Sequence, residues 1–366
     1  MLPLPPGVGW GEGAVDDGVC SLSNHSGGQR TLTLTLYLKG RGDQIRCSLH
    51  AIRICYSSST MRTIAHISDI HFGKDDPVVA EALVGELHAI KPSLVIMSGD
   101  FTQRARAGQF QRAMEWMRRL PQPQLVVPGN HDIPLWDFLR RFFAPLRRYR
   151  KYVTRDLRPT FRDDELLVMG INTARSFTFD WSGFWKDGRI SEEQLLDIEL
   201  HAKDAPASLF KIVVTHHPFI PPPKERPHGI VHGAGRALRI MEKHNIDMVL
   251  AGHLHMGYSG DVRTHHEAVK RSILSVQAGT AISTRRRGEP NAYNLITIHA
   301  IDRADVSVRA WDGLDFIEHA LSSFARDAEG RWMLREKKED PPPGTADTAL
   351  PDSLEVRASA LDGSGS

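Results

Sequence analysis

The middle of the chain alternates between short apolar runs and longer segments in which apolar residues recur every three or four positions. Five apolar runs are followed directly by polar residues, and they cover residues 64–68, 94–97, 125–127, 211–215 and 248–252. Short runs bounded by turn residues are typical of buried strands. The pattern therefore predicts strands that alternate with helices, which is the arrangement of an α/β fold with parallel strands.

The segments between the runs carry helix signals. Asp76 and Pro77 suit the N-cap and first position of a helix. Apolar residues then recur on one face from 79 to 90, and Pro92 ends the pattern. Residues 191–194 (Ser-Glu-Glu-Gln) match a capping box ahead of the fourth run. These segments are expected to cross over between parallel strands.

The residues that end the five runs are rich in groups that bind metal ions. They supply seven nitrogen or oxygen ligands and no thiolate: Asp69, His71, Asp100, Asn130, His216, His253 and His255. Two pairs, Asp69/His71 and His253/His255, are two positions apart, so we expect each pair to project to one side of an extended segment. Seven ligands exceed the four that one zinc ion usually takes. They suit two divalent cations that share a bridging carboxylate.

The polar residues after the third run can be interpreted in two ways. It leads into Pro128-Gly129-Asn130-His131-Asp132, where Pro-Gly is a turn signal. Taken alone, the three polar residues could be a capped turn. The carbonyl oxygen of Asn130 also suits a divalent cation beside carboxylates and imidazoles. Four further runs that end in the same way favour the metal-binding interpretation.

The ordered blocks D-x-H, G-D, G-N-H-D, H-H-P and G-H-x-H resemble those of the calcineurin-like metallophosphoesterase superfamily, over roughly residues 61–302. The resemblance implies an α/β fold: a four-layer α-β-β-α sandwich of two packed mixed sheets, with a dinuclear metal site at the strand ends. We expect the later apolar runs at 272–276, 295–301 and 306–310 to complete the second sheet.

The resemblance also implies roles for single residues. One metal ion would be held by Asp69, His71, Asp100 and His255, and the other by Asp100, Asn130, His216 and His253, with Asp100 as the bridge. His217 and Asp261 are candidates for binding the outer nitrogens of the ligand histidines. His131 has no metal to hold in this assignment, so it would stabilise developing charge or protonate the leaving oxygen. Asp132 would orient His131 or cap a helix.

We therefore predict a metal-dependent phosphoric ester hydrolase with two divalent ions, manganese, iron or zinc, whose activated hydroxide cleaves a phosphodiester. The motif set is most similar to that of bacterial cyclic-nucleotide-type phosphodiesterases. A hydrolase of pyrophosphate-linked lipids and a nuclease of DNA-repair type are alternatives. A non-catalytic metal-binding scaffold is least favoured, because every ligand block is intact.

Basic residues outside the blocks are candidate contacts for a phosphate-ester substrate. Arg104 or Arg106 and the loop 285–289 could reach it. The segment 136–158 carries eight cations among aromatic residues, with a predicted break at Pro145. It is either an amphipathic helix that covers the sheet or a basic lid for anionic substrates or anionic lipid headgroups. Binding of nucleic acid or an anionic membrane surface through Arg140 to Arg158 is not favoured, because the formal net charge of the chain is only +2.

Both ends of the chain differ from residues 61–336, which we predict to be the phosphoesterase domain. Residues 1–60 hold all three cysteines, and the one strand expected there, at 31–38, has no evident partner. We predict a disordered extension or a misassigned start ahead of Met61; a regulatory or targeting arm is the rival interpretation. Residues 337–366 are rich in Glu, Asp, Pro and Ser, which is typical of a disordered tail.

Sequence features also bear on the compartment. The chain has no cysteine after Cys55 and no apolar run of the roughly 18–20 residues that a membrane span needs. No basic stretch followed by an apolar stretch marks a secretory signal. We therefore expect a cytoplasmic enzyme.

Overall fold

The computed structural model describes residues 61–175, 188–221, 230–255, 258–262, 272–286 and 288–339, together with three strands within the first 60 residues. The chain divides into two compact units, Met1–Thr60 and Met61–Ser366. The disordered tail that we predicted at 337–366 is wrong for residues 337–339, which lie in the strand Trp332–Glu339, and its remainder, 340–366, lies outside the described residues.

The first unit contains a three-stranded antiparallel sheet in the order β1-β2-β3. Its strands are β1 (Val19–Asn24), β2 (Leu32–Lys39) and β3 (Arg46–His50). The strand expected at 31–38 is confirmed as β2, but the expectation that it has no partner was wrong. The short runs on either side of it pair with it through backbone groups, which the weak side-chain pattern did not reveal. That residues 1–60 are a disordered extension or a misassigned start stays a prediction.

The second unit contains a seven-stranded and a six-stranded sheet. The seven-stranded sheet has the order β16-β15-β14-β13-β4-β5-β6. Its strands are β4 (Arg62–Ile67), β5 (Leu94–Met97), β6 (Gln124–Val126), β13 (Ala292–Ala300), β14 (Arg303–Trp311), β15 (Phe316–Arg326) and β16 (Trp332–Glu339). Strands β4, β5 and β6 are parallel, and the others are antiparallel, so the sheet is mixed.

The six-stranded sheet has the order β11-β12-β10-β9-β8-β7. Its strands are β7 (Thr160–Arg162), β8 (Leu166–Gly170), β9 (Phe210–Val214), β10 (Met248–Ala251), β11 (Tyr258–Asp261) and β12 (Leu274–Gln277). Strands β8, β9, β10 and β12 are parallel, and β7 and β11 pair antiparallel at the edges.

One expectation about the sheets was wrong. The runs at 295–301 and 306–310 were expected in the second sheet with 272–276, but β13 and β14 belong to the first sheet. Strand β13 pairs antiparallel with β4, with Leu295 opposite Ala65. This pairing directs Ile296 into the core between the sheets. Apolar alternation fits either sheet equally well, because both bury an inner face.

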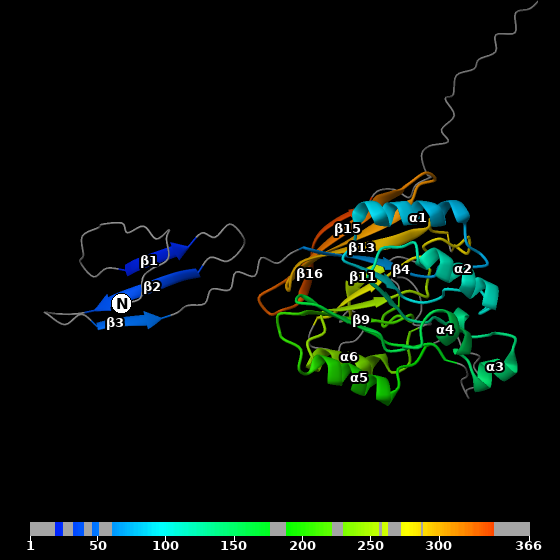
Figure 1. The fold of residues 1–366 in the computed structure, drawn as a ribbon, viewed down its shortest axis with the longest axis horizontal. Helices are drawn as coiled ribbons and strands as arrows, with labels where there is room; N and C mark the ends of the chain where they lie inside the picture. The colour runs from blue at the N-terminus through cyan, green and yellow to red at the C-terminus, as the bar shows by residue number, and fades with distance from the viewer. Residues whose placement is uncertain are drawn as a thin grey trace, which may run out of the picture. The chain divides into compact units, whose positions relative to one another are not determined.

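Four helices cover the outer faces of the sheets: α1 (Pro77–Ile90), α2 (Ala107–Met117), α5 (Glu192–Ala202) and α6 (Ala234–Lys243). Asp76 caps α1 as predicted, because its carboxylate accepts hydrogen bonds from the N–H groups of Val78 and Val79. The capping box of Ser191 and Gln194 at the start of α5 is also confirmed. In Figure 1, α1 and α2 lie on one side of the paired sheets and α5 and α6 on the other.

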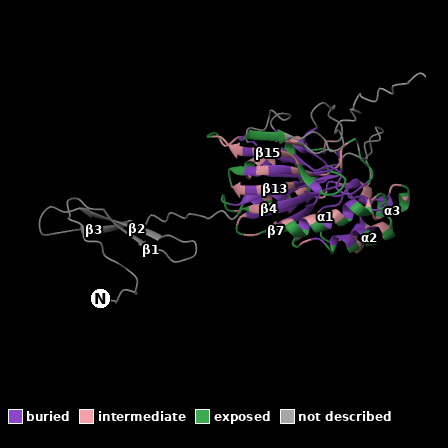
Figure 2. Ribbon diagram, turned by 90° about the horizontal axis from the view of Figure 1, so that it is seen from above, coloured by how far each residue is buried: buried purple, intermediate pink, exposed green. Residues whose placement is uncertain are grey.

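Three separate apolar clusters join these layers, which confirms the predicted four-layer sandwich. Residues alternate between clusters along each strand, as the period of a strand requires. In β4, Ala65 faces α1 and α2, and Ile64 faces the other sheet. In β9, Val213 faces α5 and α6, and Ile212 faces the first sheet. Figure 2 shows the buried strands at the centre of this unit.

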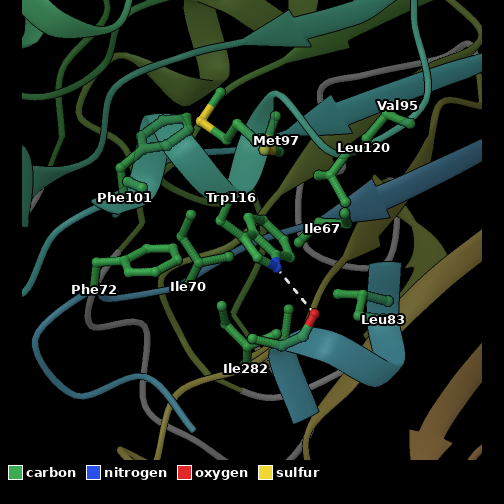
Figure 3. Packing of buried hydrophobic residues seen from close by; sticks show 14 of the residues in the cluster. Ile67, Ile70, Phe72, Leu83, Val95, Met97, Phe101, Trp116, Leu120 and Ile282 are labelled. Atoms are coloured by element: carbon green, nitrogen blue, oxygen red, sulfur yellow. Dashed lines mark hydrogen bonds between the residues drawn. The ribbon is translucent and has the colours of Figure 1, made fainter. Parts of the chain in front are cut away.

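The cluster beneath α1 and α2 positions the first ligand loops. Figure 3 shows Ile70, Phe72 and Phe101 from those loops packed with Trp116 of α2. The indole N–H of Trp116 donates a 2.9 Å hydrogen bond to the carbonyl of Ala80 in α1. The polar loop ends are therefore tied to the core through their apolar neighbours.

The basic aromatic segment forms two short helices, α3 (Phe138–Phe143) and α4 (Arg147–Tyr152), on either side of the predicted break at Pro145. Helix α4 buries Tyr149 and exposes Arg147 and Arg150, as expected of a covering helix. Helix α3 differs from that expectation: Phe143 is 85% exposed, and Arg141 is 6% exposed. No helix among the described residues is long and apolar enough to cross a membrane.

Candidate metal centre

The polar residues that follow the strands come together where the carboxyl ends of both sheets meet. Asp69 and His71 follow β4, Asp100 follows β5, and Asn130 follows β6 in the short 3-10 helix η1 (Asn130–Asp132). His216 follows β9, and His253 and His255 follow β10. The structure thus brings all seven predicted ligands into one site. Six of them are buried, and His253 is partly buried.

One group of ligand atoms surrounds the Oδ1 atom of Asp69. This atom lies 3.5 Å from Nε2 of His71 and 3.7 Å from Nε2 of His255. The Oδ2 atom of Asp100 lies 3.6 Å from the same Nε2 of His71. These four residues are the set that we assigned to the first cation.

A second group surrounds Nε2 of His216. This nitrogen lies 3.0 Å from Oδ1 of Asn130, 3.3 Å from Nδ1 of His253 and 3.4 Å from Oδ2 of Asp100. Nδ1 of His253 lies 3.0 Å from Oδ1 of Asn130. These four residues are the set that we assigned to the second cation, and Oδ2 of Asp100 belongs to both groups.

Each carboxylate has one oxygen held by the protein and the other directed into the site. Oδ2 of Asp69 accepts hydrogen bonds from the hydroxyl of Ser68 at 2.7 Å and from the N–H of His253 at 3.0 Å. Oδ1 of Asp100 accepts a 2.8 Å hydrogen bond from the N–H of His131. The remaining oxygens are thereby oriented before any cation binds, as preorganised metal sites require.

The protonation pattern shows that the site fits cations. Nδ1 of His216 lies 2.7 Å from the carbonyl of Ser98, which can only accept, so the proton of the neutral ring is on Nδ1. In that neutral ring Nε2 is left to bind a cation, and it lies 3.0 Å from Oδ1 of Asn130. Oδ1 of Asp69 and both ring nitrogens of His71 are buried without a hydrogen-bond partner among the described residues. Buried acceptors that face one another are costly without a cation between them.

Charge in the site acts in the same direction. Burial would raise the pKa of Asp69, but His255 and His71 hold that pKa well below its usual range. Burial would lower the pKa of His216, but Asp100 and Asp69 raise it to about 9. Burial, joined by the nearby His216, lowers the pKa of His253 to about 3. The site therefore combines ionised carboxylates, which stabilise positive charge at His216, with a neutral imidazole at His253, and this combination suits divalent cations.

The groups that bind the second ring nitrogen of the ligand histidines, the one directed away from the metal centre, differ from our expectation. His216 uses the carbonyl of Ser98, and Nδ1 of His255 lies 2.6 Å from the hydroxyl of Thr280. We had named His217 and Asp261 for this task. His217 instead pairs with the hydroxyl of Thr173 at 2.8 Å. Asp261 accepts from the hydroxyl of Ser272, which lies just before β12. A serine carbonyl and a threonine hydroxyl leave no pattern in the sequence that marks them as histidine partners.

The backbone, rather than the alternation of a strand, aims the paired ligands. Five of the seven have positive φ: Asp69 (54°), His71 (44°), Asp100 (54°), His253 (74°) and His255 (58°). Our expectation that each pair lies on an extended segment was therefore wrong. Left-handed conformations are unfavourable for residues with a Cβ atom, and strain of this kind gathers at functional sites.

Glycines of the motifs make the close approach possible. Gly99 has φ of +97°, and a Cβ atom there would lie 2.6 Å from Nδ1 of His216. At Gly252 a Cβ atom would lie 1.8 Å from the hydroxyl oxygen of Ser68. These two positions explain why G-D and G-H-x-H need their glycines.

His131 lies beside the two groups without joining either. Its ring is perpendicular to that of His71, with centroids 4.9 Å apart. Nδ1 lies 2.9 Å from the carbonyl of Gln103, and Nε2 lies 2.7 Å from Nη1 of Arg285. The ring therefore donates from Nδ1 and accepts at Nε2 from an arginine of the loop that we expected near the substrate. Burial lowers the pKa of His131 despite the nearby Asp100.

Asp132 does not hold His131 in the way that we expected. Its carboxylate accepts hydrogen bonds from the N–H groups of Gly129, Phe101 and Thr102 at 3.0–3.2 Å, and from the Thr102 hydroxyl at 3.1 Å. Burial and the nearby Asp100 raise the pKa of Asp132 to about 7, against the hydrogen bonds from Gly129 and Phe101. Asp132 ties the loop after β6 to the loop after β5, and its catalytic role stays a prediction.

Comparison with known proteins agrees with this geometry. Residues 62–257 match the family model of the calcineurin-like phosphoesterases. A probable cyclic nucleotide phosphodiesterase of Synechococcus sp. is 24% identical over 211 residues, which are 54% of this chain and 74% of that protein. The glycerophosphodiester phosphodiesterase GpdQ of Enterobacter lignolyticus is 28% identical over 176 residues, 43% of this chain and 57% of that protein.

A solved structure supports the fold. The purple acid phosphatase PPD1 of yellow lupin (Lupinus luteus) superposes with a TM-score of 0.54 at 11% identity, covering 88% of this chain and 69% of that one. The family match spans more than half of the chain and contains all five ligand blocks, the last of which ends at His255. The chain belongs to the calcineurin-like phosphoesterase family and is a metal-dependent phosphoric ester hydrolase.

Proposed function

We propose that the protein hydrolyses a phosphodiester with two divalent cations, held by the two ligand groups that share Asp100. The position of Oδ2 of Asp100, 3.6 Å from Nε2 of His71 and 3.4 Å from Nε2 of His216, carries the proposal. A bridging carboxylate needs an oxygen atom that lies close to both ligand groups, and Oδ2 of Asp100 has this position. Bound there, two cations supply Lewis-acid activation of the phosphoryl group and a nucleophilic water of lowered pKa. The metal could be manganese, iron or zinc.

The residues of the chain orient the substrate around this centre. Asn130 and His131 are neighbours in η1, so one element supplies a ligand and a group that faces the substrate side. Nε2 of His131 accepts a 2.7 Å hydrogen bond from the guanidinium of Arg285. We infer that His131 and Arg285 act together, with Arg285 stabilising negative charge on the phosphoryl oxygens. This favours the charge-stabilising role of His131 over proton donation, because Nε2 holds no proton in this pairing.

Relatives support the choice of a diester. The two similar proteins are a probable cyclic nucleotide phosphodiesterase and a glycerophosphodiester phosphodiesterase. A phosphodiester is common to both names, and a cyclic nucleotide is the first candidate. We place the reaction in the cytoplasm. Cys20, Cys47 and Cys55 all precede the catalytic unit, so that unit contains no cysteine and needs no oxidising compartment for disulfides.

Turnover of two small substrates tests this proposal. The full chain, loaded with manganese, is compared on bis(p-nitrophenyl) phosphate and p-nitrophenyl phosphate. We expect the diester to have the higher kcat/KM. A preference for the monoester would contradict the diester proposal and indicate a phosphatase. The variant Asp100→Asn is the matched control, because it changes one oxygen of the bridging carboxylate and should remove turnover of either substrate.

Helix α3 favours one second candidate, the hydrolysis of a pyrophosphate-linked lipid. Five large apolar side chains around α3 are 48–85% exposed: Trp136, Phe138, Leu139, Phe142 and Phe143. Exposed cations of the same segment, among them Arg147 and Arg150, could face anionic headgroups. Turnover of a pyrophosphate-linked lipid in anionic vesicles, without turnover of a water-soluble diester, would support this candidate, whereas equal turnover of a water-soluble diester would exclude it.

A further inference from the structure

A cleft lies beside the metal centre, and none of its lining residues belongs to the two ligand groups. It encloses about 510 Å³ between the loop after β4, the loop after β5 and the loop at 284–285. Its lining includes Lys74, Arg104, Arg106 and Arg285, together with Gln103 and Gln109. Four cations thus surround one cleft, and no acidic residue is among its described lining residues.

The cations of the cleft differ from other arginines nearby. Arg112 and Arg119 of the same region pair with Asp75 and Glu81. The side chains of Lys74, Arg104 and Arg106 are exposed and make no ion pair with a described residue. Like charges at close quarters repel one another, so an arrangement without carboxylates favours a bound anion.

The loop that carries Arg104 and Arg106 is held in a fixed shape. Oε1 of Gln109 accepts from the N–H groups of Arg104 at 2.9 Å and Arg106 at 3.3 Å. Between them, Ala105 has φ of 50°, and its carbonyl accepts a 2.8 Å hydrogen bond from Arg148. The N-terminus of the eleven-residue helix α2 follows directly, and its dipole adds positive potential.

The cleft is connected to the metal centre through one side chain. Gln103 and Arg285 line the cleft, and both bind the ring of His131, through the Gln103 carbonyl and the Arg285 guanidinium. The ring of His131 in turn lies against that of His71. An anion in the cleft would therefore be separated from the first ligand group by the side chain of His131.

We propose that the cleft binds a second phosphate group of the substrate. The inference rests on the proposed diester hydrolysis and narrows its substrate class to phosphodiesters that carry a further phosphate close to the scissile one. Arg285 belongs to both sites, and Arg104, Arg106 and Lys74 recognise the second phosphate. Guanidinium groups suit this task because they bind phosphate oxygens in a bidentate way.

A matched pair of chromogenic substrates tests the proposal. Thymidine 5′-(p-nitrophenyl phosphate) and its 3′-phosphorylated form share the scissile bond and the leaving group and differ by one phosphate. With the full chain and two metal ions, the 3′-phosphorylated form should have the higher kcat/KM, on the order of tenfold. The ratio should approach one in the double variant Arg104→Gln/Arg106→Gln. It should persist in Arg118→Gln, which removes an exposed cation at the other end of α2.

Binding measurements separate failure of this inference from failure of the proposed function. By calorimetry, thymidine 3′,5′-bisphosphate should bind about tenfold more tightly than thymidine 5′-monophosphate, and the double variant should lose this difference. Equal affinities in the natural chain, or a difference that the double variant retains, would overturn the cleft proposal. If neither diester is hydrolysed, the diester function is wrong, and the binding comparison still decides the cleft. Inorganic pyrophosphate, tested in the same way, shows whether the two phosphates can be directly linked.

Discussion

Nη1 of Arg285 lies 2.7 Å from Nε2 of His131, although 154 positions separate the two residues. The loop after β12 thereby reaches the end of β6, which belongs to the other sheet. Because the carbonyl of Gln103 faces Nδ1 of His131, both nitrogens of this ring are bound. The ring can therefore hold Arg285 in one orientation beside the metal centre.

Replacement of Arg285 by glutamine should slow hydrolysis without releasing the metal ions. The guanidinium makes no contact in either ligand group, so metal content should stay at the level of the natural chain. Removal of one preorganised donor to a phosphoryl oxygen should lower kcat/KM by about 100-fold. Steady-state kinetics together with elemental analysis check both parts. Arg118→Gln serves as the control for loss of one positive charge, and a parallel loss of metal in Arg285→Gln would refute the substrate-side role.

Variants of Asp100 and His131 should separate metal binding from catalysis. Asp100→Ala removes the oxygen that both ligand groups share, so the protein should lose metal and nearly all activity. His131→Ala leaves all seven ligand side chains in place and should keep its metal while the rate falls by about 100-fold or more. Metal content and kcat are measured on the same preparations. Normal turnover by His131→Ala would exclude the role that we give this residue.

The carboxylate of Asp132 should contribute mainly to stability. It accepts four hydrogen bonds that join the loops after β5 and β6, and it is fully buried. Asp132→Ala would leave buried N–H groups without partners, which should cost about 3 kcal/mol in the free energy of unfolding. Urea unfolding measures this loss. If Asp132 instead orients His131, the variant would unfold at the same urea concentration as the natural chain and lose only rate.

The ligand residues could be predicted from the sequence because each follows an apolar run directly. A strand that is buried on both faces has a recognisable composition, and its polar end must lie at the sheet edge where sites form. The same local rule could not assign β13 to a sheet, because pairing with β4 is made by backbone groups that are identical in every strand. It also could not show that Asp132 binds the backbone of Phe101.

Backbone conformation was the second feature hidden from the sequence. The spacing of Asp69 and His71 suggests an extended pair, but both residues have positive φ. Aspartate and histidine tolerate that region better than most residues, yet nothing in the block distinguishes a strained turn from a strand end. Likewise, the pairing of Arg285 with His131 depends on two loops from different sheets, and no pattern along the chain connects them.

The catalytic unit should function without the first 60 residues. Residues 1–60 and 61–366 are separate compact units, the family match begins at residue 62, and all proposed ligands follow it. A chain that begins at Met61 should therefore keep its metal content, its kcat/KM for bis(p-nitrophenyl) phosphate and its melting temperature. Thermal unfolding and kinetics on both forms check this. A large loss of activity in the shorter chain would instead assign the first unit a part in the enzyme.

Two glycine substitutions should have opposite effects, because only one glycine is needed for close approach. A Cβ atom at Gly252 would lie 1.8 Å from the Ser68 hydroxyl oxygen and 2.8 Å from Oδ2 of Asp69. Gly252→Ala must therefore displace the carboxylate of the first ligand group, and we expect loss of metal and a destabilisation of about 1–3 kcal/mol.

At Gly85, on the exposed side of α1, a Cβ atom would meet nothing within 4 Å. Gly85→Ala should leave metal binding unchanged and raise stability by about 0.4–1 kcal/mol, since alanine favours the helix. Unfolding curves and metal content of the two variants decide the matter: similar behaviour of both would mean that the contact of Gly252 with Ser68 and Asp69 does not shape the site.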